Sequence, residues 1–331
     1  IDPHDVSALR AWYTETHAGA VAGRRFPLVF AFDSVAASLR NPSTTANRAV
    51  YAAFDGDTVM GSLKLDYSLK ENLDTVEWTL NVAPEHRGTG VGGALLDHGV
   101  AVAAKQGRHK HLTEVDVPLG AELADHPGSR FALKHGFESL HTEERMVLEL
   151  PLPAQRLSEL RQAAQRHHGE YDFVSWTANC PDEFVDAYVD MRNTMERDVP
   201  TGELEHEPKV WDAERLRESE KRLTEQGFTA LTTAARHHSG AFAGYSLMFV
   251  PGNSPEEVFQ DDTLVVSNHR GHRLGAALKV RNLETLRDRF GERLRVHTWT
   301  DPDNTPMRDI NRDFGFETVE VMHEFERVDP A

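Results

Sequence analysis

The sequence has little cysteine and no long apolar run. Cys180 is the single cysteine in 331 residues, so neither an intrachain disulfide nor a zinc site built from several thiolates can form. No stretch approaches the roughly 20 apolar residues that a helix needs to cross a bilayer. The first residues, IDPHDVSALR, do not have the basic start and apolar segment of a secretory signal. We therefore expect a cytoplasmic protein with no membrane partner.

Positive charge is also scarce. Lysine and arginine number 36 against 53 aspartates and glutamates, which gives a formal net charge of -17. Such a chain repels the phosphate backbone, so we expect no nucleic acid partner. It attracts cations such as protonated amines, although the same charge also serves solubility. The 18 histidines form no HExxH motif, and we expect no bound metal.

What the sequence does contain is a repeat of domain size. HRGTGVGGAL begins at His86 and HRGHRLGAAL begins at His269, and each is followed by a similar corner, KHGFES around Gly136 or DFGFET around Gly315. Both landmarks recur in the same order at nearly the same spacing, which predicts a duplicated domain. A chain of 331 residues has room for two domains of ordinary size.

Within each copy the order of local signals is the same. Apolar periodicity and turn residues predict a helical region, a hairpin, a further strand, a glycine-rich turn, a helix, a strand, a helix and a strand. The hairpins have Asp55-Gly56 and Ser239-Gly240 in their turns. This order predicts the α/β class, with a mixed sheet and helices around it in each copy. Pro151 and Pro153 end the first copy, so we predict domains at 1–155 and 156–331.

The glycine-rich turn of the first copy is suited to bind phosphate. RGTGVG lies at Arg87–Gly92 between a strand and a helix, where glycines let backbone N–H groups approach a ligand at the helix N-terminus. Arg87 adds a charged donor. The Walker A lysine is missing, and a hairpin precedes the turn where a Rossmann unit requires a parallel βαβ unit. The alternative interpretation is a tight packing turn without a ligand.

These residues resemble the GNAT superfamily of acyl-CoA-dependent N-acetyltransferases, whose pyrophosphate signature is Q/R-x-x-G-x-G/A. Arg87, Gly90 and Gly92 match it; in the second copy Arg270 and Gly275 match, but Arg273 replaces the middle glycine. The tandem arrangement is similar to that of mycothiol synthase-like and uncharacterised actinobacterial tandem members. The resemblance implies two tandem GNAT-like domains, each a mixed, mostly antiparallel sheet flanked by helices, with acetyl-CoA as cofactor and CoA as product. The implied cofactor-binding residues are Leu80, Val82, Arg87, Gly88, Thr89, Gly90, Val91, Gly92 and Gly93 in the first copy, and Val265, Arg270, Gly271, His272, Arg273, Leu274, Gly275, Ala276 and Asn304 in the second.

Acetylation of an amine requires a base, because an alkyl amine is almost fully protonated at neutral pH. Strand alternation puts Asp261 on the face that the resemblance turns toward the acceptor, and a β-bulge there would bring Asp262 instead. Glu77 stands at the aligned place in the first copy, but strand alternation puts its side chain on the opposite face of the strand. We take these three as candidate catalytic residues; the alternative is that the paired aspartates mark a solvated strand start.

The acid that should protonate the leaving thiolate has no candidate. The resemblance implies a tyrosine four residues before the corner glycine, but Ala132 and Asn311 stand at these positions. The second copy adds an acidic segment, 198–207, which the resemblance places beside the acceptor pocket, where a carboxylate-rich rim would attract a cationic amine; the alternative interpretation is a solvated loop. The second copy is therefore our choice for the catalytic half.

Together these patterns predict an acyltransferase that moves an acetyl group from acetyl-CoA to a primary amine of a small, cationic molecule, directly and through a ternary complex. The alternative is a non-catalytic or regulatory acyl-CoA-binding protein. The predicted partner is a small-molecule amine, and the chain is expected to be a monomer or homodimer. The sequence does not identify the acceptor or decide whether both copies bind CoA.

Overall fold

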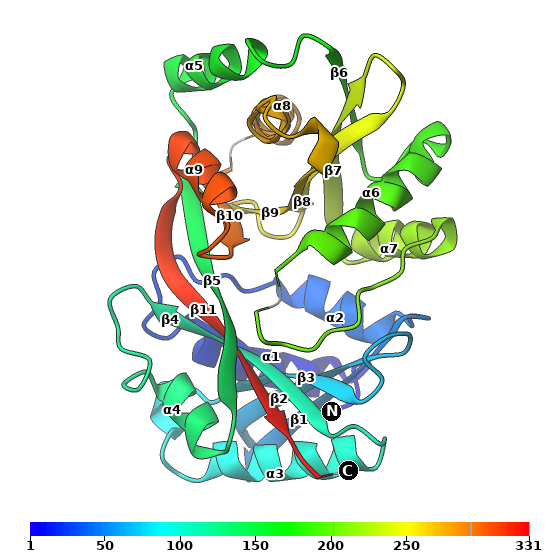
Figure 1. The fold of residues 1–331 in the computed structure, drawn as a ribbon. Helices are drawn as coiled ribbons and strands as arrows, with labels where there is room; N and C mark the ends of the chain where they lie inside the picture. Colours follow the sequence, from blue (N-terminus) through cyan, green and yellow to red (C-terminus); the bar gives the residue numbers. More distant parts are fainter. Residues whose placement is uncertain (201, 292, 331) are drawn as a thin grey trace. The chain divides into compact units, whose positions relative to one another are not determined.

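The computed structural model describes residues 1–200, 202–291 and 293–330, which group into two compact units (Figure 1). Unit 1 contains residues 1–143, 202–207 and 319–330, and unit 2 contains 144–200 and the described part of 208–318. No described helix is long and apolar enough to cross a membrane.

Unit 1 begins with two helices and continues with a sheet that has helices on both faces (Figure 1). Its elements are α1 (Val6–Val21), α2 (Phe32–Arg40), β1 (Ala46–Asp55), β2 (Thr58–Ser68), β3 (Thr75–Asn81), the 3-10 turn η1 (Pro84–His86), α3 (Val91–Ala104), β4 (Lys110–Pro118), α4 (Pro127–Lys134), the start of β5 (Glu138–Glu149) and most of β11 (Glu317–Val328).

Local signals explain why these elements form. Asp5 caps α1, since its carboxylate accepts hydrogen bonds from the backbone N–H groups of Ser7 and Ala8 at 3.0 Å. Gly56 has φ 57° in the turn between β1 and β2, as the Asp-Gly pattern predicts. The core lies mainly between α3 and the sheet, where Leu63 and Trp78 are buried.

Unit 2 has the same order of elements, preceded by one additional helix and one additional strand. Its elements are the end of β5, α5 (Ala154–Gln165), β6 (Tyr171–Thr177), η2 (Asp182–Phe184), α6 (Val185–Asp198), α7 (Ala213–Glu225), β7 (Phe228–His237), β8 (Phe242–Pro251), β9 (Glu257–Val265), η3 (Ser267–His269), α8 (Leu274–Phe290), β10 (Arg295–Thr300), α9 (Thr305–Phe314) and the start of β11.

Two cores sandwich the sheet of unit 2. Tyr245 and Leu247 of β8 pack with Tyr188 of α6 on one face. Met248 of β8 packs with Leu283 of α8 on the other face, as the alternation of side chains along a strand requires. Helices α6 and α7 therefore lie opposite α8, as Figure 1 also shows.

The strand that closes each unit comes from a distant part of the sequence. In unit 1, β4 pairs antiparallel with β11, from Pro118 opposite Glu320 to Lys110 opposite Val328. In unit 2, β10 pairs antiparallel with residues 144–149 of β5. The predicted boundary at residue 155 stays a prediction, but the compact grouping puts 144–155 in unit 2 and 319–330 in unit 1.

The predicted fold class is confirmed. Each unit has one parallel strand pair, β3 with β4 or β9 with β10, among antiparallel neighbours. Both predicted hairpins are present, and helices precede each of them as predicted. The parallel pair in each unit is important for function, because the glycine-rich turn follows its first strand.

Candidate active site

The parallel strands part from each other in both units. In unit 1, β3 pairs with β4 only from Thr75 to Trp78, although β3 continues to Asn81. In unit 2, β9 pairs with β10 only from Glu257 to Phe259 and continues to Val265. Beyond these points β3 and β9 each have a backbone edge without a ladder partner among the described residues. A ligand with amide groups can occupy such a strand opening. The predicted cofactor residues Leu80, Val82 and Val265 lie at or just after these unpaired ends.

The turn after β3 has the conformation that a phosphate nest needs. Gly88 and Gly90 have φ 79° and 90°, and an added Cβ on either would meet nothing within 4 Å. Gly90 is the N-cap of α3, so the free N–H groups of that helix begin at this open position. Arg87 donates its Nε–H to the carbonyl of Val82 at 2.9 Å, which fixes the side chain beside the turn.

Three further predicted residues support this turn. The Thr89 hydroxyl donates to the carbonyl of His86 at 2.7 Å. Val91 begins α3, and a Cβ added at Gly92 would lie 3.0 Å from the ring of Phe131 in α4. Gly92 therefore allows close helix packing, whereas Gly93 has open space around it. The predicted nest of unit 1 is thus a single open turn at the start of α3.

The turn in unit 2 keeps the same backbone despite its arginine. Arg273 is the N-cap of α8 with φ 53° and ψ 25°, the left-handed conformation that Gly90 has in unit 1. A non-glycine residue with positive φ is uncommon and strained, so the surrounding structure maintains it. Gly271 has φ 88° and Gly275 allows Ile310 of α9 to approach. The replacement of the consensus glycine has therefore kept the left-handed backbone at this position.

The arginine of this second nest has a carboxylate partner. Arg270 donates through Nη2 to Asp198 at 3.0 Å and through Nε to the carbonyl of Val265 at 3.1 Å. Asp198 therefore competes with a bound anion for Arg270. The other predicted residues surround the turn: His272 contacts the carbonyl of His167, Leu274 is buried, and Ala276 packs against the core of α8. Asn304 caps α9, since its Oδ1 accepts from the Met307 N–H at 3.3 Å.

A β-bulge lies where the sequence raised that alternative. Ser246 of β8 pairs with Thr263 and Met248 pairs with Gln260, so the single residue Leu247 faces both Asp261 and Asp262. The bulge follows the last residue of β9 that pairs with β10. The aligned stretch of unit 1, around Glu77, pairs with β2 without a register shift. The two aspartates therefore sit at the strand opening of unit 2.

The two aspartates have different environments. Asp262 accepts a hydrogen bond from the Tyr245 hydroxyl at 2.5 Å, and its Oδ2 lies 3.6 Å from Nε of Arg192. Asp261 keeps solvent-exposed surface. The protein packed around Asp261, and secondly the charge of Asp262, raise its pKa to about 7, while Arg192 and Lys209 oppose this increase. Asp261 is therefore the aspartate that can exchange a proton near neutral pH.

Sequence reasoning missed the residues that hold Asp262. Arg192 of α6 lies between this carboxylate and the ring of Trp211, whose centroid is 4.2 Å from the guanidinium carbon. Trp211 is held by Asn193 and by Glu196, which accepts from the indole N–H at 2.9 Å. An arginine one helical turn from buried Tyr188 was a visible signal, but its partner lies on a distant strand.

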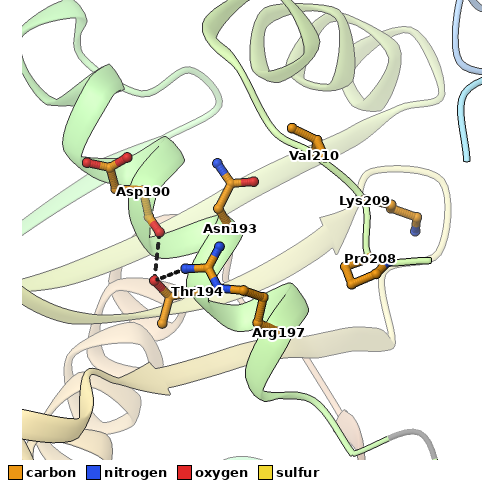
Figure 2. Close-up of a pocket in the computed structure, with 7 residues that line it drawn as sticks. All are labelled: Asp190, Asn193, Thr194, Arg197, Pro208, Lys209 and Val210. Atoms are coloured by element: carbon orange, nitrogen blue, oxygen red, sulfur yellow. Dashed lines mark hydrogen bonds between the residues drawn. The ribbon is translucent and has the colours of Figure 1, made fainter. Parts of the chain in front are cut away.

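A pocket of about 680 Å³ lies beside this network in unit 2. Figure 2 shows α6 on one side of the pocket and the segment 208–210 on the other. The lining includes Asp190, Arg197 and Lys209, and Lys209 is close enough to Asp261 to influence its pKa. The pocket therefore presents both signs of charge next to the candidate base. Its lining residues are Asp190, Asn193, Thr194, Arg197, Pro208, Lys209 and Val210.

Three residues of the acidic segment do not line this pocket, and the predicted acidic rim of the acceptor site stays a prediction. Glu203, Glu205 and Glu207 group with unit 1 and do not line the pocket, which begins at Pro208. The Glu207 carboxylate accepts from the backbone N–H of Asn72 at 2.9 Å in unit 1. Sequence proximity to α6 suggested the rim, but long-range hydrogen bonds decide where this segment lies.

Unit 1 has its own carboxylates on the aligned face of its sheet. Burial, and then the charges of Glu324, Asp116 and Glu77, raise the pKa of Glu114 to about 7. The sequence did not single out Glu114, because its register partner Glu324 is at the far end of the chain. Nearby, Arg24 forms ion pairs with Asp116 at 2.7 Å and with buried Glu320 at 2.5 Å. Arg24 thereby ties the connection between α1 and α2 to β4 and β11.

Comparisons with known proteins agree with this geometry. The Acetyltransferase (GNAT) family matches residues 7–137. A mycothiol acetyltransferase of Rothia mucilaginosa (strain DY-18) is 26% identical over 301 residues, which are 86% of this chain and 79% of that protein. A tandem GNAT protein from the clavulanic acid biosynthesis pathway has a TM-score of 0.81 at 24% identity, covering 100% of this chain and 98% of that one. A GCN5-related N-acetyltransferase from Sphaerobacter thermophilus has a TM-score of 0.61 at 13% identity, covering 90% and 85%. Residues 7–137 therefore match the acetyltransferase (GNAT) family, and nearly the whole chain is similar in sequence to a mycothiol acetyltransferase and in fold to a tandem GNAT protein.

Proposed function

We propose that this protein transfers an acetyl group from acetyl-CoA directly to a primary amine of a small molecule, and that unit 2 carries out the transfer. The observation that carries this proposal is the position of Asp261 on a β-bulge, at the strand opening and near Lys209 of the pocket. A base whose pKa of about 7 matches the working pH is suited to deprotonate an ammonium group.

The residues of both nests fit acetyl-CoA. Each nest has a left-handed residue at the N-cap of a helix, an arginine beside it, and a strand opening before it. The helix N-termini at Gly90 and Arg273 would hold the diphosphate, and the unpaired edges of β3 and β9 would hold the amide-containing arm. Bound acetyl-CoA supplies the acetyl group as an activated thioester.

The residues around the bulge have different roles in the transfer. Asp261 accepts a proton from the ammonium group, which makes the amine a nucleophile. Tyr245 and Arg192 hold the Asp262 carboxylate beside Asp261, and the charge of Asp262 increases the proton affinity of that base. The bulge takes backbone N–H groups out of the ladder, and one of these can polarise the thioester carbonyl.

The pocket lining gives a direction for the substrate search. Arg197 and Lys209 accompany Asp190, so the lining favours an amine that also carries an anionic group. The cationic acceptor expected from the sequence stays a prediction. A screen should therefore contain polyamines, aminoglycosides and amino sugars together with amino acids and sugar phosphates that carry an amine.

The test is release of the CoA thiol from acetyl-CoA by the whole chain with each amine of this screen. Cys180 is buried, and burial raises its pKa to about 12, so the protein itself gives little background with a thiol reagent. On a confirmed substrate, Asp261→Asn should lose about 10²–10⁴-fold in turnover while CoA binding is retained. If Asp261→Asn and Asp262→Asn keep full activity while Glu77→Gln is inactive, unit 2 is the wrong half.

One observation favours a second function. Neither Ala132 nor Asn311, at the positions implied for the acid, can give up a proton near neutral pH. A protein that binds acyl-CoA without catalysing transfer would not need an acid at either position. Binding of CoA by calorimetry without transfer to any amine of the screen would support this alternative.

A further inference from the structure

A buried polar cluster occupies the α8 side of the strand opening in unit 2. Its members come from β8, β9, β10, α8 and α9, and each side chain belongs to a residue that is at most 3% exposed. Polar groups are uncommon in protein interiors, because each buried group must replace the hydrogen bonds that it made with water. The members of the polar cluster are Ser246, Gln260, Lys279, Asn282, Thr300 and Asn311.

Lys279 is the only charged member of the polar cluster. Its Nζ donates to Oδ1 of Asn311 at 2.7 Å, and the amide of Asn311 in turn donates to the Thr300 hydroxyl at 3.0 Å. Nζ also lies 5.4 Å from the ring centroid of Phe316. Burial lowers the pKa of Lys279 to about 7, and no charged group of the described residues contributes to that shift. Lys279 is thus a buried amine that can exchange a proton near neutral pH.

Two acceptors of the polar cluster lack donors. Gln260 donates its amide N–H groups to the carbonyl of Leu247 at 2.8 Å and to that of Asp262 at 3.2 Å, but its Oε1 has no partner in the described part of the chain. Oδ1 of Asn282 is also buried and has no hydrogen-bond partner in the described part of the chain. Each such acceptor costs about 1–3 kcal/mol unless a donor arrives. Since Gln260 directly follows the last β9 residue paired with β10, a ligand in the opening can supply N–H donors.

Unit 1 shows that the fold itself does not require this cluster. The corresponding positions of unit 1 are apolar and filled by packing: the ring of Trp78 would lie only 2.3 Å from a Cβ added at Gly99. The polar cluster is therefore a property of unit 2, the half in which the bulge and the pocket also lie. By the spacing of the repeat, Leu96, Gly99 and Ala132 stand where unit 2 has Lys279, Asn282 and Asn311.

We propose that Lys279 donates the proton to the thiolate that acetyl transfer releases in unit 2, with Asn311 and Thr300 as positioning residues. This inference rests on the proposed function. In the step, one N–H bond of the Lys279 ammonium breaks and one S–H bond forms on the sulfur, so Lys279 becomes a neutral amine and CoA leaves as a thiol. Lys279 regains its proton from water after the product leaves. Asn311, at the position implied for a tyrosine, holds the donor and does not act as one.

Lys279→Met tests the proton donor, because methionine has a similar length and no exchangeable proton. On a confirmed substrate we expect a loss of about 10²–10⁴-fold in turnover. We also expect the turnover of the wild type to fall at high pH as Lys279 loses its proton, and this fall should be absent in Lys279→Met. Lys279→Arg should be equally slow, because arginine keeps its proton up to a pKa above about 12. Rescue by arginine would mean that only the positive charge matters and would overturn the proposal. Leu96→Met in unit 1 is the matched control.

A second measurement requires no amine substrate. Free CoA is bound to the protein with the nest of unit 1 disabled by Gly90→Asp, and the ultraviolet absorbance of the thiolate is followed against pH. Arginine keeps its charge at the pH where a thiol titrates, so the pKa of the bound thiol should be higher in Lys279→Met than in Lys279→Arg if the side chain at position 279 lies beside the sulfur. An unchanged thiol pKa overturns the inference even if amines are acetylated. A raised thiol pKa without any acetyl transfer would support it while the proposed function fails.

Unfolding of the protein without ligand checks that Lys279→Met keeps its fold. The pKa of Lys279 is lowered in the folded state, so the buried ammonium costs stability at pH 6, and this cost disappears as the pH rises through the unfolded value of 10.5. Lys279→Met should therefore raise the melting temperature more at pH 6 than at pH 10. A gain that is equal at both pH values would mean that Lys279 is not held as a titrating buried amine, which overturns the proposal.

Discussion

Gly90 is the residue whose substitution tests the phosphate nest of unit 1 most directly. Its φ of 90° and ψ of -7° are left-handed, and an added Cβ would meet nothing within 4 Å. A side chain there would add about 1–2 kcal/mol of backbone strain, plus its own chemistry. Asparagine and aspartate have nearly the same shape, and both tolerate left-handed backbone. Gly90→Asn and Gly90→Asp therefore differ mainly by one negative charge.

The size of the charge effect follows from Coulomb's law. A carboxylate about 6 Å from one phosphate charge, at an effective dielectric constant of about 40, is repelled by about 1.4 kcal/mol. A diphosphate with two charges doubles this to about 3 kcal/mol, which is about a hundredfold in affinity. Allowing for screening by salt, we expect the unit 1 site to bind CoA more than about tenfold more weakly in Gly90→Asp than in Gly90→Asn.

The assay is calorimetric titration of the whole chain with CoA. Gly107→Asp is the control, because Gly107 has φ 70° and open space but lies beyond the other end of α3. This control should bind CoA like the wild type and show a similar loss of melting temperature. Equal affinity of Gly90→Asp and Gly90→Asn, with both folded, would refute the assignment of a phosphate nest to this turn.

Three further predictions follow from the same contacts. Asp261→Asn should raise the melting temperature more at pH 8 than at pH 5. Folding raises the pKa of the Asp261 carboxyl from 3.8 to about 7, so its ionisation costs stability, and this cost grows above pH 3.8 and is complete only above pH 7. An equal gain in melting temperature at both pH values would contradict the pKa shift. Asp198→Asn should strengthen CoA binding at unit 2 by up to about fivefold in calorimetry, because it frees Arg270 from an exposed ion pair worth about 0.2–1 kcal/mol. Unchanged affinity would mean that Arg270 does not contact the ligand. Gly99→Ala should destabilise the protein by about 1–3 kcal/mol in denaturant unfolding because its Cβ would overlap the Trp78 ring, whereas Gly93→Ala in the same helix should not; equal effects would refute the packing argument.

The sequence alone predicted the repeated order of elements, because the signals for it are local. The Asp55-Gly56 turn and the turn after Arg87 each act through neighbouring residues. The same short motifs carried the resemblance to the GNAT superfamily, whose model matches residues 7–137. Arg273 replaces the glycine that the resemblance implies in the second nest, yet the backbone there is left-handed as at Gly90. A local pattern reports which conformation a residue prefers, and packing decided which conformation this arginine has.

The choice between Asp261 and Asp262 shows where local reasoning ends. Alternation along one strand allowed either residue to face the acceptor, depending on a bulge. The register of β8 against β9 puts the bulge there, and Arg192 of α6 with Tyr245 of β8 then engages Asp262. Three elements must be assembled before the two carboxylates become different.

Only the tertiary structure decided the remaining features. The closing strands pair β4 with β11 and β10 with β5, and Lys279 meets Asn311 across two helices. These partners are distant in the sequence, and each residue type taken alone is typical of its element: a lysine in a helix, an asparagine before a corner, a glutamate in a strand. Their chemistry arises from burial and from the partner that the fold brings near. Neither can be predicted from the residues that are adjacent in the sequence.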